Sequence, residues 1–99
     1  MVTLLASVVS ESVAAQVRRL GERDGIRNIR VFGSFARNQA GPDSDLDLLV
    51  EYVPGQSGFA FVRFCREVEE LVGRKVDVAT DRSLHPLIWD KVLAEALPL

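Results

Sequence analysis

The chain has 99 residues, of which 47% are apolar and 26% are charged, and its formal net charge is −2. This length and composition predict one globular domain over residues 1–99, with a real core and no room for a second. The negative charge argues against a protein whose main task is to grip long nucleic acid through its phosphates. We therefore expect no direct binding of long nucleic acid.

Two features of the chain bear on its location. The apolar N-terminus carries no basic residue before its short apolar run, so we expect neither a signal peptide nor a membrane span. Cys65 is the single cysteine, which excludes an internal disulfide and suits a reducing compartment. Cys65 lies in a helix-like segment among apolar residues and is predicted to be a small core residue. A cytoplasmic protein is expected.

The first half of the chain predicts a helix followed by two strands. Apolar residues recur at helical spacing over residues 10–24, and Gly25 is a natural stop. Residues 28–32 read as a β-branched strand, and residues 34–38 are expected to form a short helix leaving it. The loop chemistry of residues 41–44 then leads into a second strand that ends before Pro54.

The second half predicts a helix, a strand and a final helix. Residues 58–72 carry a wide apolar stripe closed by Gly73, residues 74–80 alternate as a third strand, and Pro86 marks the start of the last helix. His85 beside it is predicted to have a structural or surface role, because no nucleophile lies near it in sequence. This order of elements indicates a small α/β domain with a three-stranded sheet covered by helices.

The stretch 31–52 combines a strand end, a Gly-Ser turn, a loop and a strand that bears two spaced carboxylates. Asp45 and Asp47 are two residues apart in an extended run, so both side chains leave the same face of the sheet, about 7 Å apart. Like charges at this distance are costly unless a cation lies between them, and Mg²⁺ prefers such oxygen ligands. Asp77, between Val76 and Val78, is expected to join this polar face.

Gly33 and Ser34 follow the first strand directly. At the start of a short helix they would point free backbone amides and the Ser34 hydroxyl at an anion. A metal site and a phosphate site would then lie side by side, as a nucleoside triphosphate requires. The alternative is that the aspartates are solvent-exposed strand residues without a functional role, but strands disfavour aspartate.

The pattern G-S-x10-D-x-D resembles that of the minimal nucleotidyltransferases of the DNA polymerase beta-like superfamily. The likeness is carried by VFGSFAR, SDLDLLVEY, LVGRK and KVDVAT, and it spans most of the chain. It implies a mixed sheet in a small nucleotidyltransferase fold and a catalytic core of three aspartates. By this resemblance Asp45, Asp47 and Asp77 would hold two Mg²⁺ ions, and Gly33 and Ser34 would contact the triphosphate.

Arg37 has two interpretations that the resemblance does not separate. It would either steady the triphosphate or form an ion pair with acidic residues at the surface. ATP is expected as the substrate from the family alone, because no residue distinguishes adenine from the other bases.

Many stand-alone proteins of this family are similar to the antitoxin of a prokaryotic toxin–antitoxin pair whose partner is a HEPN-domain ribonuclease. The resemblance implies transfer of AMP from ATP to a tyrosine hydroxyl of that toxin. Two alternatives stay open, an antitoxin that acts by binding alone and a nucleotidyltransferase with a small-molecule acceptor. The last helix and the N-terminus carry more apolar residues than so small a domain can easily bury, which favours a protein partner. A homo-oligomer is also possible.

Overall fold

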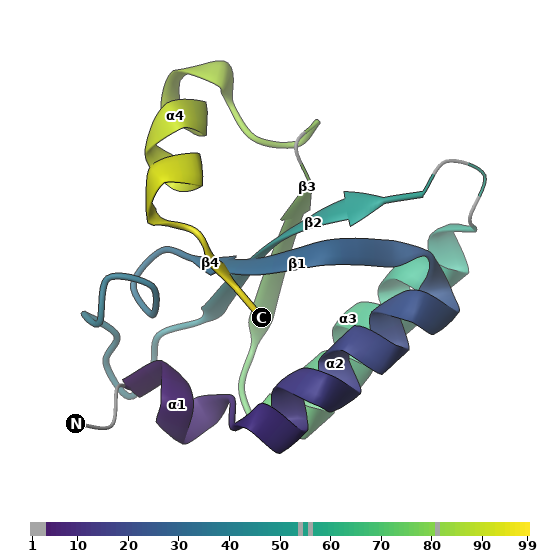
Figure 1. Ribbon diagram of the computed structural model, residues 1–99, viewed down its shortest axis with the longest axis horizontal. Coiled ribbons are helices and arrows are strands. Elements are labelled where there is room, and N and C mark those ends of the chain that lie inside the picture. The colour runs from purple at the N-terminus through teal and green to yellow at the C-terminus, as the bar shows by residue number, and fades with distance from the viewer. Residues whose placement is uncertain (1–3, 54, 56, 81) are drawn as a thin grey trace.

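The computed structural model describes residues 4–53, 55, 57–80 and 82–99. Helices and strands alternate along most of the chain (Figure 1). The elements are α1 (Leu4–Val8), α2 (Glu11–Asp24), β1 (Ile26–Phe32), β2 (Leu46–Tyr52), α3 (Gly58–Val72), β3 (Val76–Thr80), α4 (Pro86–Glu95) and β4 (Leu97–Pro98). None of the helices in these residues is long and apolar enough to span a membrane.

One mixed sheet organises the domain, with the strand order β3-β2-β1-β4. Strand β1 runs antiparallel to both β2 and β4, whereas β2 and β3 are parallel. A parallel pair needs a crossover connection, and α3 provides it. The predicted mixed sheet covered by helices is thereby confirmed, and a two-residue strand, β4, is added at its edge.

The main core lies between the sheet and the helix pair α2 and α3, which run side by side (Figure 1). Alternate residues of β2 point into it, because successive side chains leave opposite faces of a strand. Its members from the sheet and the two long helices include Leu46, Leu48, Val50, Val31, Val17, Phe64 and Val68, all without exposed surface. Helix α4 lies on the other side of β1 and β2, which leaves part of that face open (Figure 1).

Capping residues that can be recognised in the sequence define the ends of the helices. The Ser10 hydroxyl accepts the Val13 N–H at the start of α2, and the Ser57 hydroxyl accepts the Ala60 N–H at the start of α3. Gly25 and Gly73 end these helices in the left-handed conformation, with φ of 73° and 70°. His85 Nδ1 accepts the Leu87 N–H at the start of α4, which confirms its structural role.

The helical turn expected over residues 34–38 is present, but it does not continue as a helix, because the structure has consecutive turns there. Gly33 and Asn38 have positive φ values of 75° and 56°. Only four residues separate these left-handed positions, so there is room for a single turn with an Arg37 N–H to Gly33 O hydrogen bond of 3.1 Å. Cys65 is half-buried against the core, as predicted, and burial raises the pKa of its thiol.

A buried carboxylate ties α2 to α3. Asp24 has no exposed surface, and it accepts hydrogen bonds from Arg23 on its own helix and from Arg63 on α3. Arg23 also pairs with Glu67, which extends the contact along α3. The hydrogen bonds from Arg23 lower the pKa of Asp24 to about 2, although burial opposes this shift. Asp24 therefore stays ionised inside the helix pair.

Replacing Asp24 by Asn is expected to lower the free energy of unfolding by about 2 kcal/mol at neutral pH, because Arg23 and Arg63 lose the charged acceptor of their three hydrogen bonds. A carboxylate with a lowered pKa stabilises the fold above its unfolded pKa, near 3.8, and loses this effect as the pH falls toward about 2. Urea unfolding at several pH values should show a difference between wild type and variant that shrinks over this range. The exposed Asp90→Asn is the control, and an equal loss there would contradict the prediction.

Candidate active site

Three carboxylates meet on the face of β2 that turns away from α2 and α3. Asp47 lies in β2 and Asp77 is its direct partner in the parallel strand β3. Neighbouring strands are about 4.8 Å apart, so these two side chains leave the same face close together. Asp45 precedes β2 by one residue and shares the face of Asp47. The structure thus brings together the three aspartates that the sequence singles out.

The charges of this cluster influence one another. Asp47 is half-buried, and burial followed by the charges of Asp77 and Asp45 raises its pKa above the ordinary 3.8. Arg37 acts in the opposite direction on the same carboxyl group. Lys75 Nζ lies 3.9 Å from Asp45 Oδ2, at a largely exposed position. The cluster therefore carries like charges that the described cations offset only in part.

Gly33 lies directly against the Asp47 carboxylate. A Cβ atom at this position would lie 2.2 Å from Asp47 Oδ2, and the backbone φ of +75° is one that L residues rarely adopt. Both the close approach and the backbone conformation therefore require glycine. The turn that begins here holds Ser34 beside the carboxylates by chain connectivity.

The loop between β1 and β2 is fastened to the rest of the domain from two sides. Phe35 is buried in the core, and the Arg74 guanidinium lies over its ring, 4.8 Å from the centroid. Arg74 Nη1 also donates to the Ser44 carbonyl at 2.9 Å. Because Ser44 directly precedes Asp45, Arg74 fixes the approach to the carboxylate strand. Sequence reasoning had no signal for this contact between residues 30 positions apart.

Glu95, the last residue of α4, reaches the same loop. Its Oε1 accepts the Gly33 N–H at 3.0 Å, and both of its oxygens accept from Arg37 Nη1, at 3.2 and 3.0 Å. Burial opposes ionisation, but the bonds from Arg37 and Gly33 outweigh it and lower the pKa of Glu95. The Gly33 amide is therefore not free in this structure. Sequence analysis did not single out Glu95.

The three aspartates supply only oxygen donors, the set that Mg²⁺ prefers. Among the residues that the structure describes, however, no group of three or more His, Cys, Asp or Glu side chains is arranged so that it could hold a metal ion. The paired positions of Asp47 and Asp77 and the raised pKa of Asp47 still fit a site that a cation would stabilise. Side-chain rotation would be needed to converge the three carboxylates.

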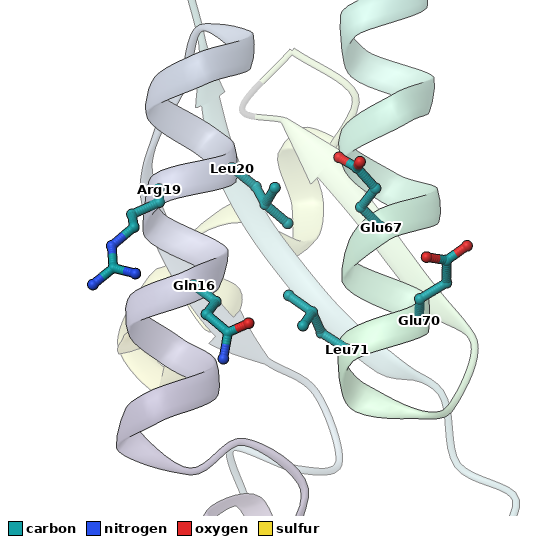
Figure 2. A pocket seen from close by; sticks show the side chains of 6 residues that line it. All are labelled: Gln16, Arg19, Leu20, Glu67, Glu70 and Leu71. Carbon is teal, nitrogen blue, oxygen red and sulfur yellow. The ribbon is translucent and has the colours of Figure 1, made fainter.

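A groove lies elsewhere, between α2 and α3 (Figure 2), with a volume of about 390 Å³. Leu20 and Leu71 lie between the helices, and Glu67 and Glu70 project from α3. Its complete lining is Gln16, Arg19, Leu20, Glu67, Glu70 and Leu71. This groove is on the helical side of the sheet, away from the face of Asp47, and we do not assign it to the candidate site.

The fold and these side chains define the class of the protein as a nucleotidyltransferase. Residues 13–98 match the family model described as a nucleotidyltransferase domain, and the chain belongs to this family. The match includes β1, the Gly33 turn, and the strands that carry Asp47 and Asp77.

Two archaeal relatives and one solved structure resemble most of the chain. The protein adenylyltransferase MntA of Thermococcus cleftensis is 35% identical over 97 residues, which cover 98% of each chain. A Methanocaldococcus jannaschii protein, named provisionally as a protein adenylyltransferase, is 44% identical over 76% of this chain and 81% of its own. A structure provisionally described as a minimal nucleotidyltransferase has a TM-score of 0.79 and 41% identity, covering 89% and 90% of the two chains.

More distant structures share the fold. A toxin–antitoxin complex with AMP-PNP has a TM-score of 0.69 at 17% identity, covering 86% of this chain and 70% of its own. The structure of a tri-AMPylated Shewanella oneidensis HEPN toxin with its MNT antitoxin has a TM-score of 0.63 at 16% identity, covering 89% and 69% of the two chains. At these identities the likeness establishes a common architecture.

Gly33→Ala is expected to remove nucleotide binding and to lower the thermal unfolding temperature, because its methyl group would collide with Asp47 Oδ2. Calorimetric unfolding and titration with Mg²⁺ and ATP measure the two effects. Gly41→Ala in the same loop is the matched control, since the nearest atom to its added Cβ would be Ser44 Oγ at 3.9 Å. Equal behaviour of the two variants would contradict this account of Gly33.

Proposed function

We propose that this chain is a Mg²⁺-dependent protein adenylyltransferase antitoxin, which transfers AMP from ATP to a tyrosine hydroxyl of a HEPN-domain toxin and so neutralises it. The observation that carries the proposal is the pairing of Asp47 with Asp77 on adjacent strands, next to the Gly33 turn. Binding alone gives no reason to place like charges together on one sheet face. A nucleotidyl transfer site requires them.

The acceptor and the nucleotide are supported by the relatives. The Thermococcus cleftensis relative, aligned over nearly its whole length, is named as a protein adenylyltransferase. The toxin–antitoxin structures of the same fold include one with AMP-PNP and one with an AMPylated HEPN toxin. These names favour ATP as the nucleotide donor and a protein hydroxyl as the acceptor.

Each site residue has a role in this proposal. Asp45, Asp47 and Asp77 would hold two Mg²⁺ ions, with Asp77 beside the attacking hydroxyl. Bound Mg²⁺ would neutralise the triphosphate and the departing pyrophosphate and lower the pKa of the attacking hydroxyl. Gly33 lets Asp47 lie close to the turn, and Ser34 and Arg37 would donate to the phosphate oxygens.

The reaction itself is a single displacement at the α-phosphorus. The tyrosine oxygen forms a bond to phosphorus, the bond from phosphorus to the pyrophosphate oxygen breaks, and the hydroxyl proton leaves to solvent. This chain contributes mainly positioning and charge, since such transfers need little covalent chemistry from the protein. No histidine base is required in this scheme.

Helix α4 offers an apolar surface for the acceptor protein. Leu87 is 88% exposed, and Ile88 and Leu93 are exposed to 45% and 39%. The helix lies on the side of β1 and β2 opposite α2 and α3 (Figure 1). Asp47 also leaves that face of β2, because its neighbours Leu46 and Leu48 point into the core. A partner that covers α4 would thus approach the face that carries Asp47.

An antitoxin that acts by binding alone is the second candidate. Two observations favour it: the described carboxylates do not converge on a common metal position, and Lys75 pairs with Asp45. Activity and binding are therefore tested separately.

Asp47→Asn and Asp77→Asn are each expected to reduce nucleotide transfer at least a hundredfold, because they remove charge at the proposed metal site. The measurement is the intact mass of the protein encoded beside this one, after incubation with this chain, Mg²⁺ and each of the four nucleoside triphosphates. Wild type should add units of AMP with ATP only.

Glu70→Gln on α3, which is exposed, is the control for these two variants and should transfer normally. A stable complex without any gain in mass would instead support the binding antitoxin. A gain in mass that survives both substitutions would contradict the site assignment.

Leu87→Ser is expected to weaken the complex with the neighbouring protein at least tenfold, because an exposed leucine at an interface loses its apolar contact. Its thermal unfolding temperature should not change, since Leu87 is almost fully exposed. Val62→Ser on α3, where Val62 is 53% exposed, is the matched control. Isothermal titration measures both affinities, and equal losses would count against α4 as the contact surface.

A further inference from the structure

Glu95 connects the end of α4 to the turn that follows β1. Only 16% of its side chain is exposed, and it accepts both a backbone N–H from Gly33 and the Arg37 guanidinium. The residues it joins are 62 and 58 positions away in sequence. One carboxylate thus fixes a backbone amide and a cation of the same loop at once.

This contact differs from an ordinary surface ion pair. Exposed pairs are worth little because both side chains lose freedom and water screens the charges. Glu95 is mostly buried, and one of its partners is a rigid backbone amide that needs no ordering. The same Gly33 lies against the Asp47 carboxylate, so Glu95 acts on the turn where it meets the aspartate cluster.

The orientation of Arg37 follows from two acceptors. Nη1 donates to Glu95, and Nε donates to Gln39 Oε1 at 3.2 Å. Among the residues that the structure describes, these contacts leave the third nitrogen, Nη2, for a further acceptor. Arg37 Nη1 and the Gly33 N–H share the acceptor Glu95 Oε1, and Gly33 lies against the Asp47 carboxylate, so the guanidinium lies on the same side of the turn as Asp47. Because Glu95 and Gln39 hold Arg37, it loses less conformational freedom on binding an anion than a free arginine side chain would.

We propose that Glu95 is a positioning residue for the nucleotide, which holds the Gly33 turn and orients Arg37 so that Nη2 receives a phosphate oxygen. This inference rests on the proposed function, because it needs a nucleotide beside the three aspartates. Glu95 itself does not touch the nucleotide. Its effect passes through Arg37 and through the turn that carries Ser34.

If Glu95 competed with the nucleotide instead, its removal would change the affinity for the nucleotide in the opposite direction. A carboxylate on Gly33 and Arg37 could take the place of a phosphate and compete with it, and removing Glu95 would then tighten nucleotide binding. As a positioning residue, Glu95 must instead weaken binding when it is removed. The direction of the change separates the two roles.

The test is a double-mutant cycle on the full chain with Glu95→Ala, Arg37→Ala and both together. Titration with Mg²⁺ and ATP gives the dissociation constant of each protein, and transfer to the acceptor gives KM and kcat. Glu95→Ala should raise the dissociation constant and KM for ATP about tenfold, with kcat changed less. In the Arg37→Ala background the same substitution should have less than a twofold further effect, because Glu95 acts largely through Arg37.

Glu95→Gln keeps an oxygen acceptor for Gly33 and Arg37 and should restore part of the affinity. It also serves if Glu95→Ala fails to fold, as judged by thermal unfolding. Glu70→Ala, exposed on α3, is the control and should bind ATP as wild type does. A merely structural role for Glu95 would lower the unfolding temperature without the coupling to Arg37.

Four results would overturn the proposal. Tighter binding by Glu95→Ala or Glu95→Gln would make Glu95 a competitor of the phosphate. Fully additive effects of the two alanine substitutions would remove the action through Arg37. Wild-type chain that binds no nucleoside triphosphate at all would overturn the proposed function and this inference with it, whereas a binding wild type with unaffected Glu95 variants would overturn this inference alone.

Discussion

The enforced proximity of Asp47 and Asp77 is the constraint on which the candidate site depends. Parallel pairing of β2 with β3 places the two carboxylates side by side, and the strand order leaves them no other position. Neighbouring cations offset the charge only in part, since Arg37 is itself paired with Glu95. A domain of this size tolerates such a cost when a ligand relieves it, because binding to the folded state stabilises that state.

The two faces of β2 have different roles: one packs into the core that stabilises the fold, and the other carries the candidate site. Leu46, Leu48 and Val50 pack without exposed surface against α2 and α3, and this side also holds the buried Asp24. The opposite face carries the carboxylates and the turn at Gly33. Because the helical side contains a contiguous apolar core, the polar face can be held in an unfavourable arrangement of charges without loss of the fold.

Much of this architecture could be predicted from local sequence patterns. Serine and glycine at the ends of α2 and α3 mark their bounds, and the spacing of Asp45 and Asp47 gives a shared face without any knowledge of the fold. Contacts distant in sequence could not be predicted. Arg74 on Phe35 and Glu95 on Gly33 depend on the packing of whole elements, and the two residues of β4 carry no periodic signal.

The edges of the sheet have a consequence for solution behaviour. At one edge, β4 is only two residues long, and at the other, β3 presents Asp77 as the second of its five residues. Short edges and charged side chains on an edge strand discourage the addition of a strand from another molecule. Asp77, which we place in the reaction, therefore also helps to keep the sheet from extending between chains. The same residue serves the proposed chemistry and helps the protein to remain dispersed at high concentration.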